Sequence, residues 1–251
     1  KSQTFRTSSS RINLEALRSA AKIIKKNAEM DPLSNLQFCV SANVSPNTPF
    51  FPAAFHFSDQ PSFSLAFEMA DEVSRVFRRA SSLIEAKNNL KERFLRIYEA
   101  VLEVSEEVGK KYDIKFSGMD FSPAPYPKLT RSIGYAVEKL GVEYFGSPGS
   151  LLAIALITQC IPNRKKVLGF SGFMQPVLED YVIAKRLSEN RITLDSLMLY
   201  STLCGTGLDC VPLPGDVTEK ELFHVLLDVC TLSVIHDKPL TARLMPLPGK
   251  K

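Results

Sequence analysis

Residues that could do chemistry stand in short segments rich in proline or glycine. One is Asp120-Phe121-Ser122-Pro123-Ala124-Pro125, which we predict to be the loop after an apolar strand. Its two prolines restrict the backbone and remove two amide donors, so Asp120 and Ser122 would lie on a stiff turn. Asp120 is then an acid–base candidate. The alternative is a turn in which Asp120 accepts local backbone hydrogen bonds, and the sequence favours neither interpretation.

A second segment is glycine-rich and runs from Cys204 to Asp209 (CGTGLD). The amides around Gly205 and Gly207 could bind an anion. The segment lacks the lysine and spacing of a P-loop and is not G-x-G-x-x-G, so a tight turn is the favoured interpretation. Cys204 is a candidate nucleophile, although no basic partner is near it in the sequence.

Charged residues suggest two further kinds of site. Glu179 and Asp180 are adjacent on a predicted helix, where neighbours point in different directions and make a poor acid–base pair. They suit the positive end of the helix dipole, with a carboxylate metal site as the alternative. Lys238 and Arg243 flank the last predicted strand and could bind a carboxylate or phosphate, or could be ordinary surface charges.

Histidine is scarce. Of three histidines, only His56, in Phe55-His56-Phe57, is near a plausible strand end. No H-E-x-x-H occurs, which excludes a zincin, and no G-x-S-x-G supports an α/β-hydrolase elbow. The residues point to no particular metal or cofactor.

The elements that must position these residues alternate between strand and helix. Apolar spacing predicts a helix that starts near Leu14 and ends at Asp31-Pro32. A central strand is expected from Leu36 to Val44 and a second strand around Phe63 to Phe67. Between 90 and 108, apolar residues line one side of a long helix.

From Ile114 onward a strand, a loop and a helix recur. The predicted strands are Ile114–Met119, Val142–Phe145, Lys166–Phe170, Leu199–Leu203 and Thr241–Met245. The predicted helices are Ser132–Leu140, one up to Cys160, one from Val177, a short one capped by Thr193, and one from the capping box Thr218–Glu221 to Asp237. The loops after the second and third units are 171–176 and 204–216.

This order predicts an α/β fold with parallel strands and covering helices. Right-handed crossovers bring the loops after such strands to one end, where ligands bind. We therefore expect one site that gathers the polar residues of separate loops: Asn43, His56, Asp120, Ser122, Glu179, Cys204, Asp209, Lys238 and Arg243.

Composition limits the class of protein. The 251 residues are 45% hydrophobic and 23% charged, as in a globular chain, and they predict a single α/β domain in which residues 1–10 form a polar arm or an edge strand. The net charge of +4 is spread along the chain, with its densest cluster at Arg75, Arg78 and Arg79, so nucleic-acid binding is not expected. The chain begins without methionine, which leaves a fragment or a processed chain open.

The five cysteines are odd in number and have no C-x-x-C spacing, which indicates free thiols and a cytoplasmic, reducing location. The longest clean apolar run, Leu151 to Ile157, is too short to cross a bilayer.

Several segments together resemble an uncharacterised family, that of the domain of unknown function numbered 711. They are Asn43 with Pro49 to His56 (PFFPAAFH), Gly118 to Pro125 (GMDFSPAP), Ser147 to Leu151 (SPGSL), Gly169 to Asp180 (GFSGFMQPVLED), Cys204 to Asp216 (CGTGLDCVPLPGD) and Asp237 to Lys250 (DKPLTARLMPLPGK). The resemblance implies a pyruvate formate-lyase-like fold, a barrel or sheet with covering helices. It implies no established activity.

Glycyl-radical chemistry does not follow from the resemblance, because Gly249 lies in Pro-Gly-Lys-Lys and not in an Arg-Val-x-Gly segment. The leading hypothesis is a non-radical enzyme, or a former one, with a pocket for a small metabolite. Lys238 and Arg243 would bind an anionic group of that metabolite. The rival is a binding or homo-oligomeric assembly module that uses the long helix and the arm.

Overall fold

The computed structural model describes residues 3–5, 12–46, 48–55 and 59–250. Its helices are α1 Leu14–Met30, α2 Ala70–Arg79, α3 Leu83–Tyr112, α4 Ile133–Lys139, α5 Ser150–Cys160, α6 Tyr181–Ser188, α7 Leu194–Ser201 and α8 Glu219–Ile235, with 3-10 turns η1 Ser34–Gln37, η2 Leu129–Arg131 and η3 Val177–Glu179. Its strands are β1 Gln3–Phe5, β2 Val40–Ala42, β3 Ser62–Glu68, β4 Lys115–Ala124, β5 Val167–Leu168, β6 Gly207–Pro214 and β7 Leu240–Leu247. The α/β class is thereby confirmed.

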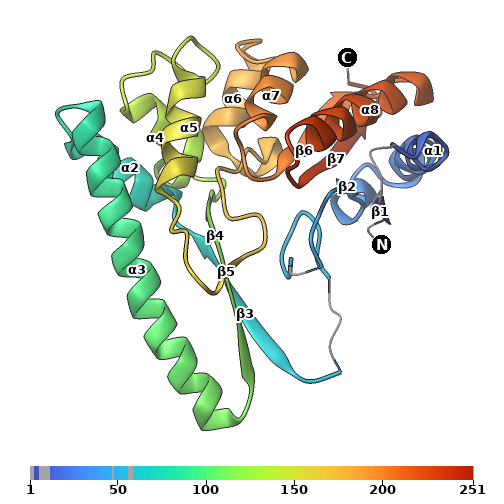
Figure 1. The fold of residues 1–251 in the computed structure, drawn as a ribbon. Coiled ribbons are helices and arrows are strands. Elements are labelled where there is room, and N and C mark those ends of the chain that lie inside the picture. The colour runs from blue at the N-terminus through green and yellow to red at the C-terminus, as the bar shows by residue number, and fades with distance from the viewer. Residues whose placement is uncertain (1–2, 6–11, 47, 56–58, 251) are drawn as a thin grey trace.

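The strands form two sheets. One has the order β1-β2-β7-β6, with β6 parallel to β7 and β2 antiparallel to β7, and the other has the parallel order β3-β4-β5. A parallel bridge between Pro176 and Asp209 connects the segment after β5 to β6. In Figure 1, α4 to α7 lie above the three-stranded sheet, and residues 48–55 lie below β2.

Aromatic and aliphatic side chains fill the space between sheets and helices. Phe121 of β4 is fully buried and contacts Phe94 of α3 and Phe67 of β3, at centroid distances of 5.4 and 5.0 Å. Leu17 and Ile24 of α1 are buried in the same core, and α1 packs against α8. Burial of such side chains is the main stabilising term, roughly 1.5–3 kcal/mol each.

Helix ends agree with the predicted caps. The Thr218–Glu221 capping box opens α8, with both of its hydrogen bonds formed, and Thr193 caps α7. The predicted helices at the start of the chain, at 132–140 and up to Cys160 are confirmed, as are the strands around Phe63–Phe67 and Thr241–Met245. Part of the N-terminal arm, Gln3–Phe5, is an edge strand beside β2.

The predicted loop from Asp120 to Pro125 was wrong, because Asp120 to Ala124 belong to β4. This segment is the buried centre of the three-stranded sheet. The register with β3 shifts between Ala66 and Phe67, so β4 bulges at Phe121 and Ser122. A bulge accommodates a proline that would otherwise interrupt the ladder.

The third predicted unit was displaced along the chain. Residues 199–201 end α7 rather than form a strand, and β6 lies inside the predicted loop 204–216. The apolar run at 197–203 has no clear period, and the Thr193 cap commits it to helix. The Val142–Phe145 strand was also wrong, and the strand expected from Leu36 to Val44 is confined to Val40–Ala42.

The long helix was predicted correctly, and its predicted apolar side packs against the core from Leu90 to Val101 but not beyond. Leu90 and Phe94 are fully buried, whereas Val104 and Val108 are 58% and 39% exposed. After Tyr98, the next buried residue of α3 is Ser105. The valines of the predicted apolar side are therefore uncovered at the far end of α3.

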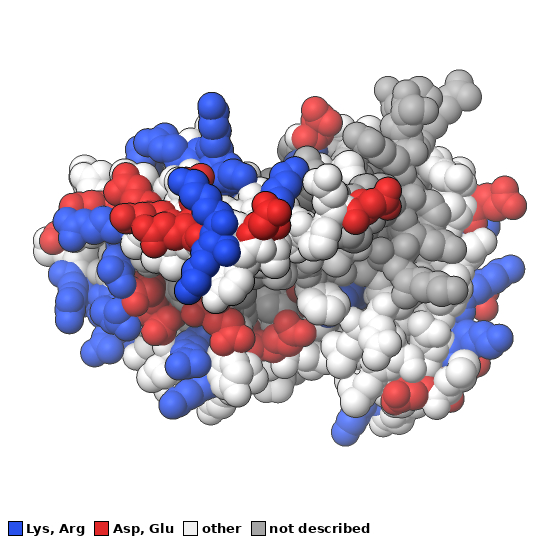
Figure 2. Space-filling model, turned by 90° about the horizontal axis from the view of Figure 1, so that it is seen from below, with Lys and Arg blue, Asp and Glu red and all other residues white. Residues whose placement is uncertain are grey.

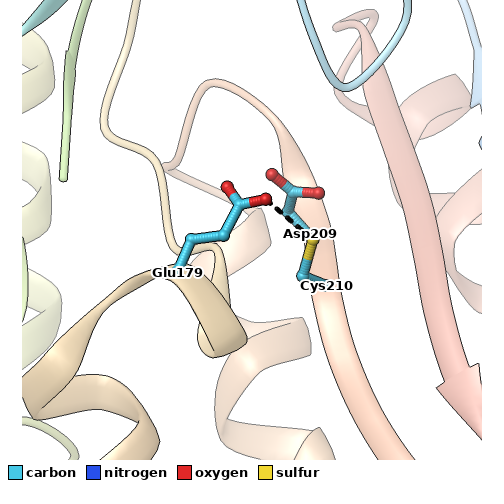
Figure 3. A group of neighbouring side chains, drawn as sticks. All are labelled: Glu179, Asp209 and Cys210. Atoms are coloured by element: carbon cyan, nitrogen blue, oxygen red, sulfur yellow. Dashed lines mark hydrogen bonds between the residues drawn. The ribbon is translucent and has the colours of Figure 1, made fainter. Parts of the chain in front are cut away.

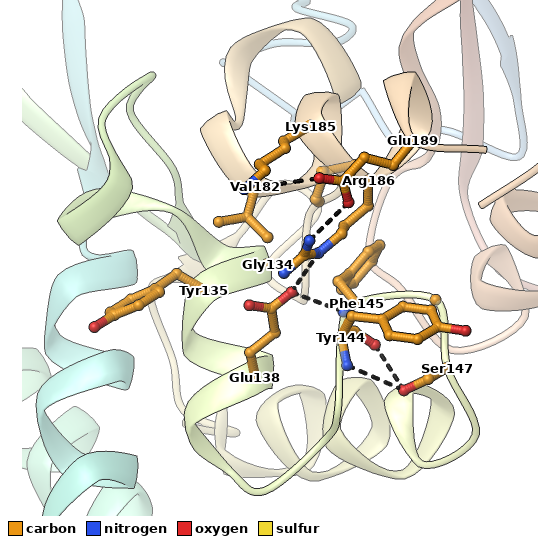
Figure 4. Close-up of polar contacts among 12 residues, drawn as sticks. Gly134, Tyr135, Glu138, Tyr144, Phe145, Ser147, Val182, Lys185, Arg186 and Glu189 are labelled. Carbon is orange, nitrogen blue, oxygen red and sulfur yellow. Dashed lines mark hydrogen bonds and ion pairs between the residues drawn. The ribbon is translucent and has the colours of Figure 1, made fainter. Parts of the chain in front are cut away.

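Polar contacts connect the helices above the sheets. The Glu138 carboxylate of α4 accepts from Arg186 of α6 (Oε1–Nε 2.8 Å) and from the Phe145 amide (3.0 Å), as Figure 4 shows. Asp180 caps both α6 and α4, since its carboxylate accepts from the amides of Val182, Ile183 and Ile133. Asp180 is thus a helix cap, as the dipole interpretation expected.

Surface charge is mixed in sign. Figure 2 shows Lys and Arg interspersed with Asp and Glu on the face that it presents. In the Arg75 to Arg79 cluster, Arg75 pairs with Glu72 (Nη1–Oε1 2.6 Å) and with Asp71. No helix in the described part of the chain is long and apolar enough to cross a membrane.

Candidate functional site

The best-supported candidate site is centred on a buried ion pair between neighbouring strands. The Asp209 side chain of β6 is fully buried, and its Oδ1 accepts from Nε of Arg243 on β7 at 2.5 Å. The register between the two strands shifts after Leu208, and Cys210 has the left-handed φ of 46°. This bulge places both side chains of the Asp209-Cys210 pair outside the regular ladder.

Arg243 is almost fully paired. Its Nη1 donates to the Leu36 carbonyl (3.2 Å), its Nη2 is 3.5 Å from Glu179 Oε1, and its guanidinium lies 5.5 Å from the Phe51 ring centroid. Burial acts to lower the pKa of Arg243, but the Asp209 carboxylate outweighs it and the pKa is raised. Arg243 therefore stays cationic, with its charge already balanced by carboxylates.

Glu179 and Cys210 complete the cluster, which Figure 3 shows as two carboxylates and a thiol meeting at one place. The Cys210 thiol donates to Glu179 Oε1 over 3.4 Å. Burial, with the nearby Asp209 charge, raises the pKa of Cys210. Glu179 is 47% exposed, so the cluster is reached from solvent on its side.

One atom of this cluster is unsatisfied. Asp209 Oδ2 is buried and has no hydrogen-bond partner among the residues that the structure describes. Gln175 Oε1 and Thr206 Oγ1 share this state, but only Asp209 is a carboxylate, for which the cost of burial without a partner is largest. Buried polar groups without partners are rare in proteins, and a water, an ion or a ligand group would satisfy this one.

Asp120 has a different position. Its Oδ1 accepts from the Ser122 amide, the Ser122 hydroxyl and the Ser171 amide, and its Oδ2 accepts from the Phe170 amide (3.0, 2.7, 3.1 and 2.9 Å). This matches the alternative interpretation, in which Asp120 accepts backbone hydrogen bonds. Two of the four donors, however, come from a loop about 50 residues away. Both oxygens are in use, so Asp120 joins β4 to the segment after β5.

Ser122 extends this connection toward the glycine-rich segment. Its hydroxyl accepts from the Gly172 amide at 3.2 Å. Gly172 packs against Gly205 so closely that a Cβ on Gly172 would lie 2.7 Å from the Gly205 Cα. Gly205 therefore permits a backbone contact. Gly207, at a φ of 97°, starts β6.

Cys204 and Lys238 hold the end of α7. The Cys204 thiol is buried, which raises its pKa, and it accepts from the Gly207 amide at 3.0 Å. The Lys238 ammonium donates to the carbonyls of Ser201, Thr202 and Cys204 (3.0, 3.2 and 2.5 Å). These contacts occupy its donors and close the last turn of the helix.

Asn43 and His56 are the two remaining predicted residues. Asn43 has a left-handed φ of 52° and donates from Nδ2 to the Ser233 carbonyl of α8 at 3.1 Å. His56 lies outside the described residues.

The structure therefore brings together Glu179, Asp209 and Arg243 from the predicted set, and it adds Cys210. Sequence reasoning counted Cys210 only among the five free thiols, and its place next to Asp209 was the one hint of more. Cys39 is a buried thiol near the pair, with its pKa raised to about 12 by burial.

Three relatives are similar over almost the whole chain. A UPF0210 protein of Pyrobaculum arsenaticum is 34% identical over 249 residues, and one of Pyrobaculum aerophilum is 34% identical over 252, each alignment covering 96% of this chain and 55% of the relative. A UPF0210 protein of Carboxydothermus hydrogenoformans is 28% identical over 253 residues, 96% of this chain and 56% of the relative. The chain thus spans about half the length of the curated relatives it matches.

The sequence profile of one family covers the chain. It is described as Uncharacterised ACR (DUF711) and matches residues 2–251, which include every segment on which the resemblance was based. The chain therefore belongs to the uncharacterised DUF711 family.

Proposed function

We propose that this chain binds a small molecule at the Asp209–Arg243 pair, through an electropositive group of the ligand that meets Asp209 Oδ2. The single observation that supports this is the buried carboxylate oxygen that has no partner among the described residues. A hydroxyl or amine donor, or a cation, would satisfy it. The proposal covers an enzyme that uses Asp209 or Glu179 as a base, as well as a binding protein without chemistry.

Charge favours an electropositive ligand group at this point over an anion. Asp209 and Glu179 each carry a negative charge and Arg243 a positive one, so the cluster has an excess of one negative charge when Cys210 is protonated. An anion would have to compete with two carboxylates for Arg243. The anionic metabolite expected from the sequence would use Arg243 only by displacing Glu179.

The proposal includes the architecture. The segment after β5 bridges to β6 at Pro176–Asp209, and this connection beside the two sheets supports a pyruvate formate-lyase-like fold as the frame of this site. Asp209 lies at that bridge.

The test is a thermal-shift screen of small metabolites that bear hydroxyl or amine groups. A ligand present at 100 times its Kd stabilises by about 2.7 kcal/mol. For a chain of this length, that corresponds to roughly 5–10 °C in Tm. We expect Asp209→Asn, and independently Glu179→Gln, to lose the shift, and exposed Asp228→Asn to keep it. Hits that stabilise Asp209→Asn and Glu179→Gln as well as the wild type would refute the proposal.

A homo-oligomeric assembly role is the second candidate, and one observation favours it. Val104, Val108 and Tyr112 are 58%, 39% and 61% exposed along one end of α3. Such a side of a helix suits a second copy of the chain. Light scattering should then give a mass above 27.9 kDa that Val104→Glu with Val108→Glu reduces to the monomer. A wild-type monomer would exclude this candidate.

A further inference from the structure

The group of residues at the proposed site has the composition of a metal centre. One oxygen of Glu179, one oxygen of Asp209 and the sulfur of Cys210 lie within 4.8 Å of one another. We propose that these three side chains bind a divalent transition-metal ion, with Zn²⁺ the best fit. This inference rests on the proposed function, because it names the electropositive species that meets Asp209 Oδ2.

The donor types and their spacing agree with zinc. Zn²⁺ accepts thiolate and carboxylate ligands together, whereas Ca²⁺ and Mg²⁺ take oxygen. With Zn–S near 2.3 Å and Zn–O near 2.0 Å, two ligand atoms on a tetrahedral ion lie about 3.5 Å apart. The Cys210 sulfur is 3.4 Å from Glu179 Oε1. A metal would therefore require little movement of these two atoms.

Charge is balanced when the metal is present. A Cys210 thiolate and the two carboxylates contribute three negative charges, and Arg243 and Zn²⁺ contribute three positive ones. Without the metal and with a neutral thiol, one negative charge is in excess. Arg243 thus offsets the third anionic ligand, and its presence beside the cluster is compatible with a cation there.

The two oxygens of Asp209 suit separate partners. Oδ1 accepts from Arg243 Nε, and Oδ2 is the buried atom that no described residue contacts with a hydrogen bond. Outer partners that hold a ligating carboxylate in one orientation are a regular feature of metal sites. Arg243 is held in turn by the Leu36 carbonyl, so Oδ2 is presented on a rigid support.

The exposed side chain of Glu179 gives solvent access to the proposed metal site. Asp209 and Cys210 are buried on a strand, whereas Glu179 is 47% exposed and lies on the short η3 turn. A metal ion would enter past Glu179. Three protein ligands leave a fourth position for water or substrate, as in catalytic zinc sites.

The experiment uses the whole chain, stripped with a chelator and titrated with Zn²⁺ alone in competition with a chromogenic zinc dye. We expect about one Zn²⁺ per chain, and affinity lower by about tenfold or more in both Cys210→Ser and Glu179→Gln, since each loses a ligand. Co²⁺ in place of Zn²⁺ should give a near-ultraviolet thiolate-to-cobalt band that Cys210→Ser abolishes. Cys39→Ser, a buried neighbouring thiol outside the group, should keep both the affinity and the band.

Three results would overturn the metal site: no zinc bound by the folded wild type, a cobalt–thiolate band that survives in Cys210→Ser, or unchanged affinity in Glu179→Gln. Glu179 is half exposed, so Glu179→Gln should fold even if a core variant does not, and circular dichroism confirms it.

The failure of this inference is distinguishable from failure of the proposed function. The metabolite screen is repeated with and without the chelator. Hits that depend on Asp209 but persist with the chelator would retain the small-molecule site and reject the metal. Zinc binding with no Asp209-dependent hit would keep Asp209 Oδ2 as the place of an electropositive species, the metal ion, and reject a hydroxyl or amine ligand there.

Discussion

Replacement of Asp120 tests whether this residue is structural or an acid–base group. Its carboxylate accepts four hydrogen bonds, from the amides of Ser122, Phe170 and Ser171 and from the Ser122 hydroxyl. In Asp120→Asn one oxygen becomes an NH₂ group. The oxygen with the fewest donors is Oδ2, which accepts only from the Phe170 amide at 2.9 Å. The new NH₂ group would face that donor.

The expected loss follows from this geometry. Asp120→Asn removes one charged hydrogen bond and leaves a buried amide unpaired, at a cost of about 2 kcal/mol. Asp120→Ala removes all four bonds, each worth roughly 1.5–3 kcal/mol to a charged group. Part of this is recovered because the buried charge is also removed, so the net loss should be about 3–5 kcal/mol.

The assay is urea unfolding followed by circular dichroism. The exposed Asp228→Asn change on α8 is the control, and its effect should stay within about 0.5 kcal/mol. An Asp120→Asn loss no larger than that of the control would refute the structural assignment. Asp120 would then again be the leading acid–base candidate.

Three further variants test other parts of the fold. Arg243→Met leaves Asp209 buried without a cation and should cost about 3–5 kcal/mol in urea unfolding, much of which the added change Asp209→Leu should restore; a double variant no more stable than the single one would contradict this. Gly172→Ala puts a Cβ 2.7 Å from the Gly205 Cα and should cost about 1–3 kcal/mol in urea unfolding, and an unchanged free energy of unfolding would contradict the close backbone packing. The Thr218 amide and hydroxyl donate to the Glu221 carboxylate and hold its pKa below the usual 4.5. The contribution of Glu221 to stability is therefore complete above pH 4.5, and it is lost as the pH falls through the lowered pKa of the folded state. The wild type and Glu221→Gln should therefore differ in unfolding midpoint at pH 7 and converge in acid, and a gap that is constant with pH would reject the link.

Local sequence signals were sufficient to predict where a helix begins and which helices bury one face along their length. The Thr218–Glu221 pair and the apolar spacing of α1 needed no distant partner. Strand positions were less predictable. Residues 199–203 and 207–214 are both largely apolar with glycine nearby. Both are distant from β7 in the sequence, and only the second segment pairs with β7 in space.

The candidate site was predictable in part. Glu179, Asp209 and Arg243 were expected to meet because they lie in segments that crossovers bring together, and they do meet. Asp120, Cys204 and Lys238 belong to the same predicted set, but their polar atoms are satisfied by backbone groups. A sequence shows that a side chain can bond, but not which donor is within 3 Å of it.

The sequence by itself determined the α/β class, most helices with their caps, the family, and which loops carry polar residues, because these depend on periodicity and on neighbours a few positions apart. Only the tertiary structure decided which of those residues share a site. The β6 bulge at Cys210 brings Asp209 into contact with Arg243, 34 positions away, and leaves one carboxylate oxygen without a partner in the part of the chain that the structure describes. That outcome depends on strand register, a long-range property that no short segment encodes.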